Sequence, residues 1–523
     1  PRMRLVWPGT QIGQEHDYAL DLLAQILGQG ELSRLVQTVR NQQKLVTSID
    51  AYNLSFTWGQ GFFGVDAVAP SEDQLDAVRE AVLEQIRKIK ADGVTVDELN
   101  RARAKTIAAV VYSAQTAEST ASRLASDVIG TGNPDYLHDY AEAIGSITTG
   151  DLTAAAQAIL DEQRIITVKL LPQRDGVEQM ARTADADLSQ MKSTPVDLDN
   201  KRLADRIAAH AEKAGAASST AELEPMQMVT LDNGLRVLIQ RDSRLPIVAM
   251  QWYHLGGLLA DDTGKEGVAN AMTNMMIKGA GDRSADDIAD ELESIGARLS
   301  TNCGNNTFYV NGLSLSDHWK QVLQLASDVI QRPTFPEDQW AQVQPRLLAA
   351  IDSVNDRWSG QMAAEFEKLY FGDHPWSQPV VGRREVVAGL SADDLRTFYR
   401  SRIAATDSVL AIVGDVDPQQ VKVEVEKLFA TMPEDAPVPF ERKTVSRAPV
   451  GVKQVETAKP LTAVQIGFGP AVRRDSADYA SVMVMTRIVS NFPSGWLHQA
   501  LRGEGPGLVY ASWAYPRTGV IPG

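Results

Sequence analysis

Two stretches near opposite ends of the sequence follow the same order of residues. Asp17-Tyr-Ala19 precedes an apolar helical pattern, a Gly-containing turn and a segment that ends at Arg40; the same order runs from Asp478-Tyr-Ala480 to Arg502. A pattern that recurs at long spacing is typical of a chain built from copies of one structural unit. Because 523 residues are also too many for one hydrophobic core, we predict three or four folding units.

The composition excludes several classes of function. The net charge of −16 argues against a nucleic-acid partner, because phosphate binding needs a basic surface. Cys303 is the single cysteine, which excludes an intrachain disulfide and a metal site of several thiolates. The seven histidines are scattered, and no two are close enough to share a helix face. No run of about 18 apolar residues is present, so we expect no membrane span.

Helix and strand signals alternate along the chain. Helix starts are predicted where Ser or Thr precedes a polar residue by three positions, at Ser71/Gln74, Thr95/Glu98, Ser284/Asp287 and Ser391/Asp394. The helix that starts at Ser284 is expected to end at Gly296, and a long helix is expected from Pro336 to about Trp358.

Strands are predicted at Ile247 to Leu255 and at Thr307 to Leu315, and Asp232-Asn-Gly234 is predicted to form a hairpin turn. Helices and strands thus alternate along the chain, and hairpins occur among the strands. This pattern favours an α+β fold, in which helices pack on mixed sheets in sandwich domains.

The segment Gly267 to Ala280 has the frame of a zinc-peptidase helix without its chemistry. In an H-x-x-E-H helix, two histidines at i and i+4 bind zinc and the glutamate at i+3 activates a water molecule. Those positions are Asn270, Thr273 and Asn274 here. A neutral carboxamide is too weak a donor to replace imidazole, and a threonine hydroxyl is no base near neutral pH. We therefore predict no metal on this helix.

Five blocks around this helix resemble, in order, the insulinase/pitrilysin family of zinc metallopeptidases. They are Thr230 to Leu238, Gly256-Gly257, Gly267 to Gly279, Ser284 to Gly296 and Val413 to Pro418. The family takes a further zinc-binding glutamate from a later helix. The matching window, Ala350 to Ser353, contains Asp352 and no glutamate.

The resemblance implies a four-domain bacterial protein whose two halves close around a chamber, with the zinc site in a part outside this segment. We assign residues 1–171 to the second domain of the first half and 172–223 to a polar linker, either a plain tether or a hinge. Residues 224–440 are assigned to a peptidase-like domain without the zinc motif, and 441–523 to the last domain. The first and last domains are expected to be incomplete.

The resemblance also identifies a second signature, an arginine followed by a Gly-Leu-x-Tyr sequence, which is Arg502 and Tyr510 here. In relatives this pair faces the zinc and can donate hydrogen bonds to the substrate carbonyl and its oxyanion. The first copy has Arg40 but Thr47 in place of the tyrosine. The segment Arg298 to Asn302 matches the edge strand that binds extended substrate in an active half, or is an ordinary sheet edge.

We expect this segment to be the non-catalytic, substrate-holding part of a zinc metalloendopeptidase that hydrolyses peptides or unfolded protein. The segment alone is then expected to bind no zinc and to be inactive. The alternative is an inactive structural or assembly subunit related to the processing peptidases. The resemblance allows a homodimer and indicates a periplasmic location, with a cytoplasmic one as the alternative.

Overall fold

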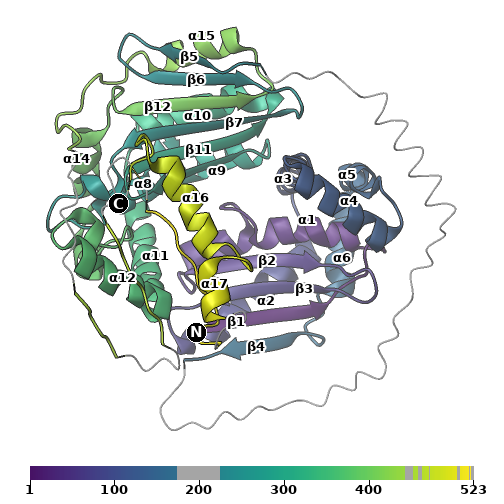
Figure 1. Ribbon diagram of the computed structural model, residues 1–523. Helices are drawn as coiled ribbons and strands as arrows, with labels where there is room; N and C mark the ends of the chain where they lie inside the picture. The colour runs from purple at the N-terminus through teal and green to yellow at the C-terminus, as the bar shows by residue number, and fades with distance from the viewer. Residues whose placement is uncertain are drawn as a thin grey trace.

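The part of the chain that the structure describes forms two β-sheets covered by helices (Figure 1). Each sheet together with its helices is called a unit, and the two units are numbered in chain order. The computed structural model describes residues 1–172, 224–441, 451–456, 462–469, 472–502, 507–517 and 519. Nearly all of the predicted linker, 173–223, therefore lies outside the described residues. The predicted α+β class with mixed sheets is confirmed.

The first sheet is antiparallel and has the strand order β2-β3-β1-β4. Its strands are β1 (Arg2–Pro8), β2 (Ser48–Leu54), β3 (Phe62–Val68) and β4 (Ile166–Leu170). Six helices accompany it: α1 (Asp17–Gly28), α2 (Leu75–Asp92), α3 (Val96–Tyr112), α4 (Ala117–Thr131), α5 (Tyr136–Ser146) and α6 (Thr149–Ile159). Gly28 lets α1 rest directly on β2, because a Cβ atom there would lie 2.1 Å from the Ala51 nitrogen.

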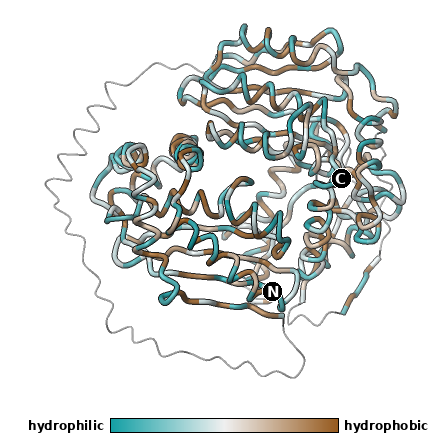
Figure 2. The backbone as a smooth tube through the Cα atoms, turned by 180° about the vertical axis from the view of Figure 1, so that it is seen from behind, coloured by the Kyte–Doolittle hydropathy of each residue, from teal (hydrophilic) through white to brown (hydrophobic). Residues whose placement is uncertain are grey.

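The second sheet is mixed and has the order β10-β11-β7-β12-β6-β5. Its strands are β5 (Gln227–Thr230), β6 (Arg236–Arg241), β7 (Ile247–Leu255), β10 (Arg298–Cys303), β11 (Thr307–Leu315) and β12 (Ser408–Gly414). Only the β12/β6 pair is parallel among these. Apolar stretches run through the strands of both sheets (Figure 2).

Helices on the second sheet enclose one apolar core that extends from Leu235 to Met432. They are α8 (Val268–Met276), α9 (Ala285–Glu293), α10 (Trp319–Gln331), α11 (Glu337–Asp356), α13 (Arg384–Gly389), α14 (Ala392–Arg402) and α15 (Pro418–Phe429). Helix α12 (Trp358–Phe371) packs on α11, and its Phe371 belongs to a separate small apolar cluster with Trp376. Two short strands, β8 (Gly279–Ala280) and β9 (Arg283–Ser284), pair beside them.

The repeated sequence near the C-terminus forms two helices, α16 (Tyr479–Ser490) and α17 (Trp496–Leu501). The first copy has α1 and a π-helical turn at Val36–Gln42 in the corresponding places. Beyond α17, Arg517 connects the C-terminal part of the chain to α12. Its guanidinium lies 2.7 Å from Glu367 and stacks over the Phe371 ring.

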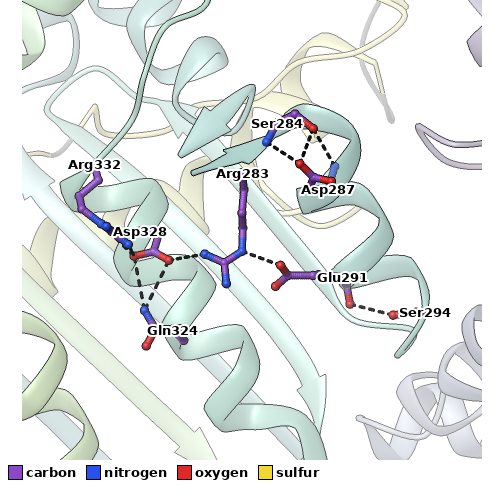
Figure 3. Close-up of polar contacts among 8 residues, drawn as sticks. All are labelled: Arg283, Ser284, Asp287, Glu291, Ser294, Gln324, Asp328 and Arg332. Carbon is purple, nitrogen blue, oxygen red and sulfur yellow. Dashed lines mark hydrogen bonds and ion pairs between the residues drawn. The ribbon is translucent and has the colours of Figure 1, made fainter. Parts of the chain in front are cut away.

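An arginine between two helices stabilises the second unit (Figure 3). The Arg283 guanidinium donates to Glu291 on α9 at 2.5 Å and to Asp328 on α10 at 2.6 Å. Asp328 is almost fully buried, and it also accepts a hydrogen bond from Arg332 at 2.5 Å.

Most local predictions are confirmed. Strands β7 and β11 have the predicted bounds, the Asp232-Asn-Gly234 segment joins antiparallel β5 and β6, and α11 is the predicted long helix. Reciprocal capping bonds form at Thr95, Ser284 and Ser391.

Two local predictions are wrong. Ser71 makes no side-chain cap, because the chain enters α2 through a 3₁₀ turn at Glu72–Gln74. Helix α9 ends at Glu293, and a turn carries the chain on to Gly296. That glycine has a φ of 63°, in the left-handed region.

The two units are in direct contact between α3 and the end of α9. The Tyr112 hydroxyl on α3 donates to the Gly296 carbonyl at 3.1 Å, and a Cβ atom on Gly296 would lie 2.5 Å from the Ala104 carbonyl oxygen. Lys105 forms an ion pair with Glu293 at 3.5 Å. Polar and close-packed contacts thus join the units.

Candidate functional site

Helix α8 carries the three positions that would bind and activate zinc in an active relative. Asp261 fixes the start of this helix, because its carboxylate accepts hydrogen bonds from the Gly267 and Ala269 backbone N–H groups at 2.7 and 2.9 Å. Burial raises the pKa of Asp261 to about 7, although the two N–H groups act in the opposite direction. The apolar side of α8, including Met272 and Met276, is fully buried in the core.

The polar side chains of α8 bind one another and the helix backbone. The Asn274 amide donates to the Asn270 carbonyl at 2.8 Å and to Asn270 Oδ1 at 3.2 Å. The Thr273 hydroxyl is buried and donates to the same backbone carbonyl at 3.0 Å. These groups do not fit a zinc ion, since a carboxamide oxygen that accepts a hydrogen bond is a poor ligand and a buried hydroxyl is no base.

The window for the distal zinc ligand lies on α11, which packs against α8. Asp352 in this window is bound instead by Arg384, whose Nε lies 2.9 Å from the carboxylate. Within the described ranges, no three His, Cys, Asp or Glu side chains are grouped so that they could hold a metal ion. The absence of zinc remains a prediction, and the donor chemistry supports it.

Arg502 and Tyr510 are brought together after α17. The Arg502 guanidinium carbon lies 4.9 Å from the centre of the Tyr510 ring, and the same guanidinium donates to the Tyr510 backbone carbonyl. Tyr510 is 86% exposed, so its phenol can reach a ligand. Neither side chain forms a hydrogen bond with α8 in the described part of the chain, and the substrate-binding role of the pair remains a prediction.

The corresponding residues of the first copy serve a structural contact. Arg40 binds Glu31 at 2.8 Å, and Glu31 also binds Lys278, directly after α8, at 3.4 Å. Burial alone would raise the pKa of Glu31, but Lys278 and Arg40 lower it. Thr47 donates to the Val68 carbonyl at 3.2 Å. The contact from Glu31 to Lys278 was not predicted, because nothing in the local sequence pairs residues so far apart.

Strand β10 forms one edge of the second sheet and pairs only with β11 among the described strands. The Arg298 guanidinium at its start lies 5.3 Å from the centre of the Tyr112 ring on α3. The first unit thus lies beside the beginning of this edge. The predicted edge position is confirmed, and the choice between a substrate edge and an ordinary one stays open.

Two models of known protein families match this chain, and together they cover strands of both sheets and helix α8. A family model described as insulinase (peptidase family M16) matches residues 236–382, and one described as the peptidase M16 inactive domain matches residues 1–106 and 389–520. The chain belongs to the insulinase family. Helix α8 lies within the match to the insulinase model, and the inactive-domain match covers the first sheet and the part of the chain from α14 onward.

Similar proteins include an uncharacterized zinc protease of Rickettsia bellii, 26% identical over 40% of this chain and 51% of that protein. A probable mitochondrial-processing peptidase subunit beta of Arabidopsis thaliana is 23% identical over 51% of this chain and 50% of that protein. The chain spans about half the length of these curated relatives.

A solved peptidase M16 inactive domain from Pseudomonas fluorescens covers 57% of this chain and 72% of its own, with a TM-score of 0.52 and 20% identity. This likeness supports the fold alone. No helix within the described residues is both long enough and apolar enough to cross a membrane.

Proposed function

We propose that this chain is the non-catalytic, substrate-holding part of a zinc metalloendopeptidase, and that the zinc site lies in a part of the protein outside these residues. The hydrogen bond from the Asn274 amide to Asn270 carries the proposal, because it joins the two positions where zinc ligands would lie. A helix with this bond keeps its place in the core and supplies neither a ligand nor a base.

The pair after α17 supports a role in substrate binding. The guanidinium of Arg502 lies over the Tyr510 ring, and the Tyr510 side chain is 86% exposed, so both groups offer hydrogen-bond donors to a ligand. Such a donor can bind a peptide carbonyl and stabilise the oxyanion that forms from it. The first copy has a threonine bonded to a strand carbonyl at the corresponding place, so it lacks this donor.

The second candidate function is an inactive structural or assembly subunit. It is favoured by the similarity to cytochrome b-c1 complex subunit 1 of Mus musculus, which is 25% identical over 41% of this chain and 45% of that protein. A scaffold of this kind would have no need for a polar pair that binds peptide.

The experiment that separates the two functions uses the full-length protein. Zinc content is measured by elemental analysis, and cleavage of fluorogenic peptides is measured with and without a chelator. One zinc per protein and chelator-sensitive cleavage support the peptidase. An intact, folded protein without zinc or cleavage contradicts it and favours the scaffold.

Export to the periplasm and assembly into a homodimer are part of the same proposal. Cell fractionation tests the first, and light scattering of the full-length protein tests the second.

A further inference from the structure

A cavity of about 400 Å³ lies in the first unit, in a region to which the proposed peptidase function assigns no role. Helices α1, α3, α4 and α5 and strand β2 contribute its walls. This volume is in the range of small-molecule sites, which are largely apolar with a few well-placed polar groups. The cavity combines both kinds of wall.

One part of the lining attracts a cation. The Asp21 carboxylate on α1 is held by the Asn53 amide and the Tyr140 hydroxyl, each at 2.9 Å. Nearby, Gln25 Oε1 and Asn53 Oδ1 are buried acceptors without a donor among the described residues. A carboxylate flanked by two free acceptor oxygens has the donor requirement of a primary ammonium group, which offers three N–H bonds.

Another part of the lining attracts an anion. Arg123 on α4 also lines the cavity, and its Nε is buried without an acceptor in the described part of the chain. Asp127, one turn later, lies 3.3 Å from Nη1 and holds the guanidinium in place. The remaining N–H groups suit a carboxylate, which guanidinium groups bind in a fork geometry. Helices α1 and α4 both pack on α5, so the two charges come from different walls.

The rest of the lining is formed by four apolar residues, Ala24, Ala109, Val110 and Leu137, and by three polar ones, Gln29, Thr106 and Ser113. We propose that this cavity binds a free α-amino acid with an apolar side chain, whose ammonium group contacts Asp21 and whose carboxylate contacts Arg123. Unpaired buried polar atoms destabilise a fold. Such a ligand would give a hydrogen-bond partner to all three of the unpaired atoms, Gln25 Oε1, Asn53 Oδ1 and Arg123 Nε. The cavity lies within residues 21–140, so its test does not depend on the zinc chemistry.

The test is calorimetric titration of the full chain with L-leucine, N-acetyl-L-leucine and L-leucinamide at about pH 7.5. The two analogues each lack one of the charges. We expect L-leucine to bind and each analogue to bind about tenfold more weakly or worse, as is typical when a hydrogen bond to a charged group is lost. Equal binding of either analogue, or no heat from L-leucine, overturns the proposal.

Variants locate the site. Asp21→Asn and Arg123→Gln should each weaken L-leucine binding about tenfold or more, while Ala109→Phe should fill the cavity and abolish binding without a change in charge. Glu118→Gln, on an exposed position of α4, is the matched control and should bind as the unaltered chain does. Circular dichroism checks folding, and Ala109→Phe decides the matter if a charge variant fails to fold. Unchanged binding by folded Ala109→Phe overturns the proposal.

Discussion

The amide nitrogen of Asn274 lies 3.2 Å from Oδ1 of Asn270, one helical turn earlier on α8. The Asn274 side chain thus binds the Asn270 side chain at the positions where an active relative binds its metal ion. Since neither carboxamide competes with imidazole for zinc, we predict that the purified chain holds no stoichiometric zinc after dialysis against micromolar metal. Elemental analysis checks this, and one tightly held zinc per chain would contradict it.

Restoring the motif should not restore activity. The triple variant Asn270→His, Thr273→Glu and Asn274→His places the ligands and the base on α8, but Asp352 on α11 stays bound to Arg384 and no glutamate is present in that window. We expect no peptidase activity with a fluorogenic peptide. The matched control adds Asp352→Glu to the triple variant. Appreciable hydrolysis by the triple variant alone would show that the distal ligand has been misplaced.

Tyr510→Phe tests the pair after α17 in the full-length protein. If the phenol donates to the oxyanion, its loss should lower kcat by about 10²-fold to 10³-fold. Folding and zinc content should not change, because Tyr510 is 86% exposed. Thr47→Val is the matched control in the first copy and should have little effect on the rate. A kcat for Tyr510→Phe within about twofold of the unaltered enzyme would make the pair structural.

Loss of Asp328 should cost more stability than loss of Arg332. Asp328 is almost fully buried and binds both Arg283 and Arg332, whereas the Arg332 side chain is 57% exposed. Removing Asp328 leaves Arg283 without its inner partner, and we expect Asp328→Ala to lower the free energy of unfolding by about 3 kcal/mol. Arg332→Ala should cost under about 1 kcal/mol because solvent screens the exposed charge. Urea unfolding measures both, and equal costs would contradict the prediction.

His254 should make the protein less stable in acid. Its ring is buried, and burial lowers its pKa to about 4 from an ordinary value of 6.5. The neutral ring accepts a hydrogen bond from the Ala404 N–H at Nε2, 3.1 Å away. Because the folded pKa is the lower one, the stabilisation is complete above about pH 6.5 and is lost as the pH falls toward 4. The full loss is about 3 kcal/mol.

The measurement compares the unaltered chain with His254→Gln by urea unfolding between pH 7.5 and about pH 4.5. The comparison is needed because burial raises the pKa of Asp261 to about 7 and that of Asp21 to about 6, and raised carboxyl pKa values have the opposite effect on stability. We expect the stability advantage of the unaltered chain to shrink as the pH falls. An advantage that stays constant with pH would contradict this assignment.

Short-range signals predicted the second sheet well. Strands β7 and β11 were predicted to the residue because each is a short run rich in apolar, β-branched and aromatic residues. The cap at Ser284 was predicted because Asp287 follows it by three residues. The same pattern was wrong at Ser71, where a 3₁₀ turn separates the serine from the helix.

Contacts between distant residues could not be predicted. The ion pair from Glu31 to Lys278 and the cavity around Asp21 depend on how whole helices pack, and neither leaves a local periodicity in the sequence. The polar positions of α8 were identified from the motif, but the hydrogen bonds from Asn274 to Asn270 could be seen only in the helix geometry.

Gly296 is subject to two independent requirements. Its φ of 63° suits the turn after α9, and its missing side chain makes room for the Ala104 carbonyl on the other unit. A left-handed asparagine would meet the first requirement and violate the second. A side chain at this turn is therefore excluded by a neighbour nearly two hundred positions earlier in the chain, so a substitution at Gly296 would force the two units apart.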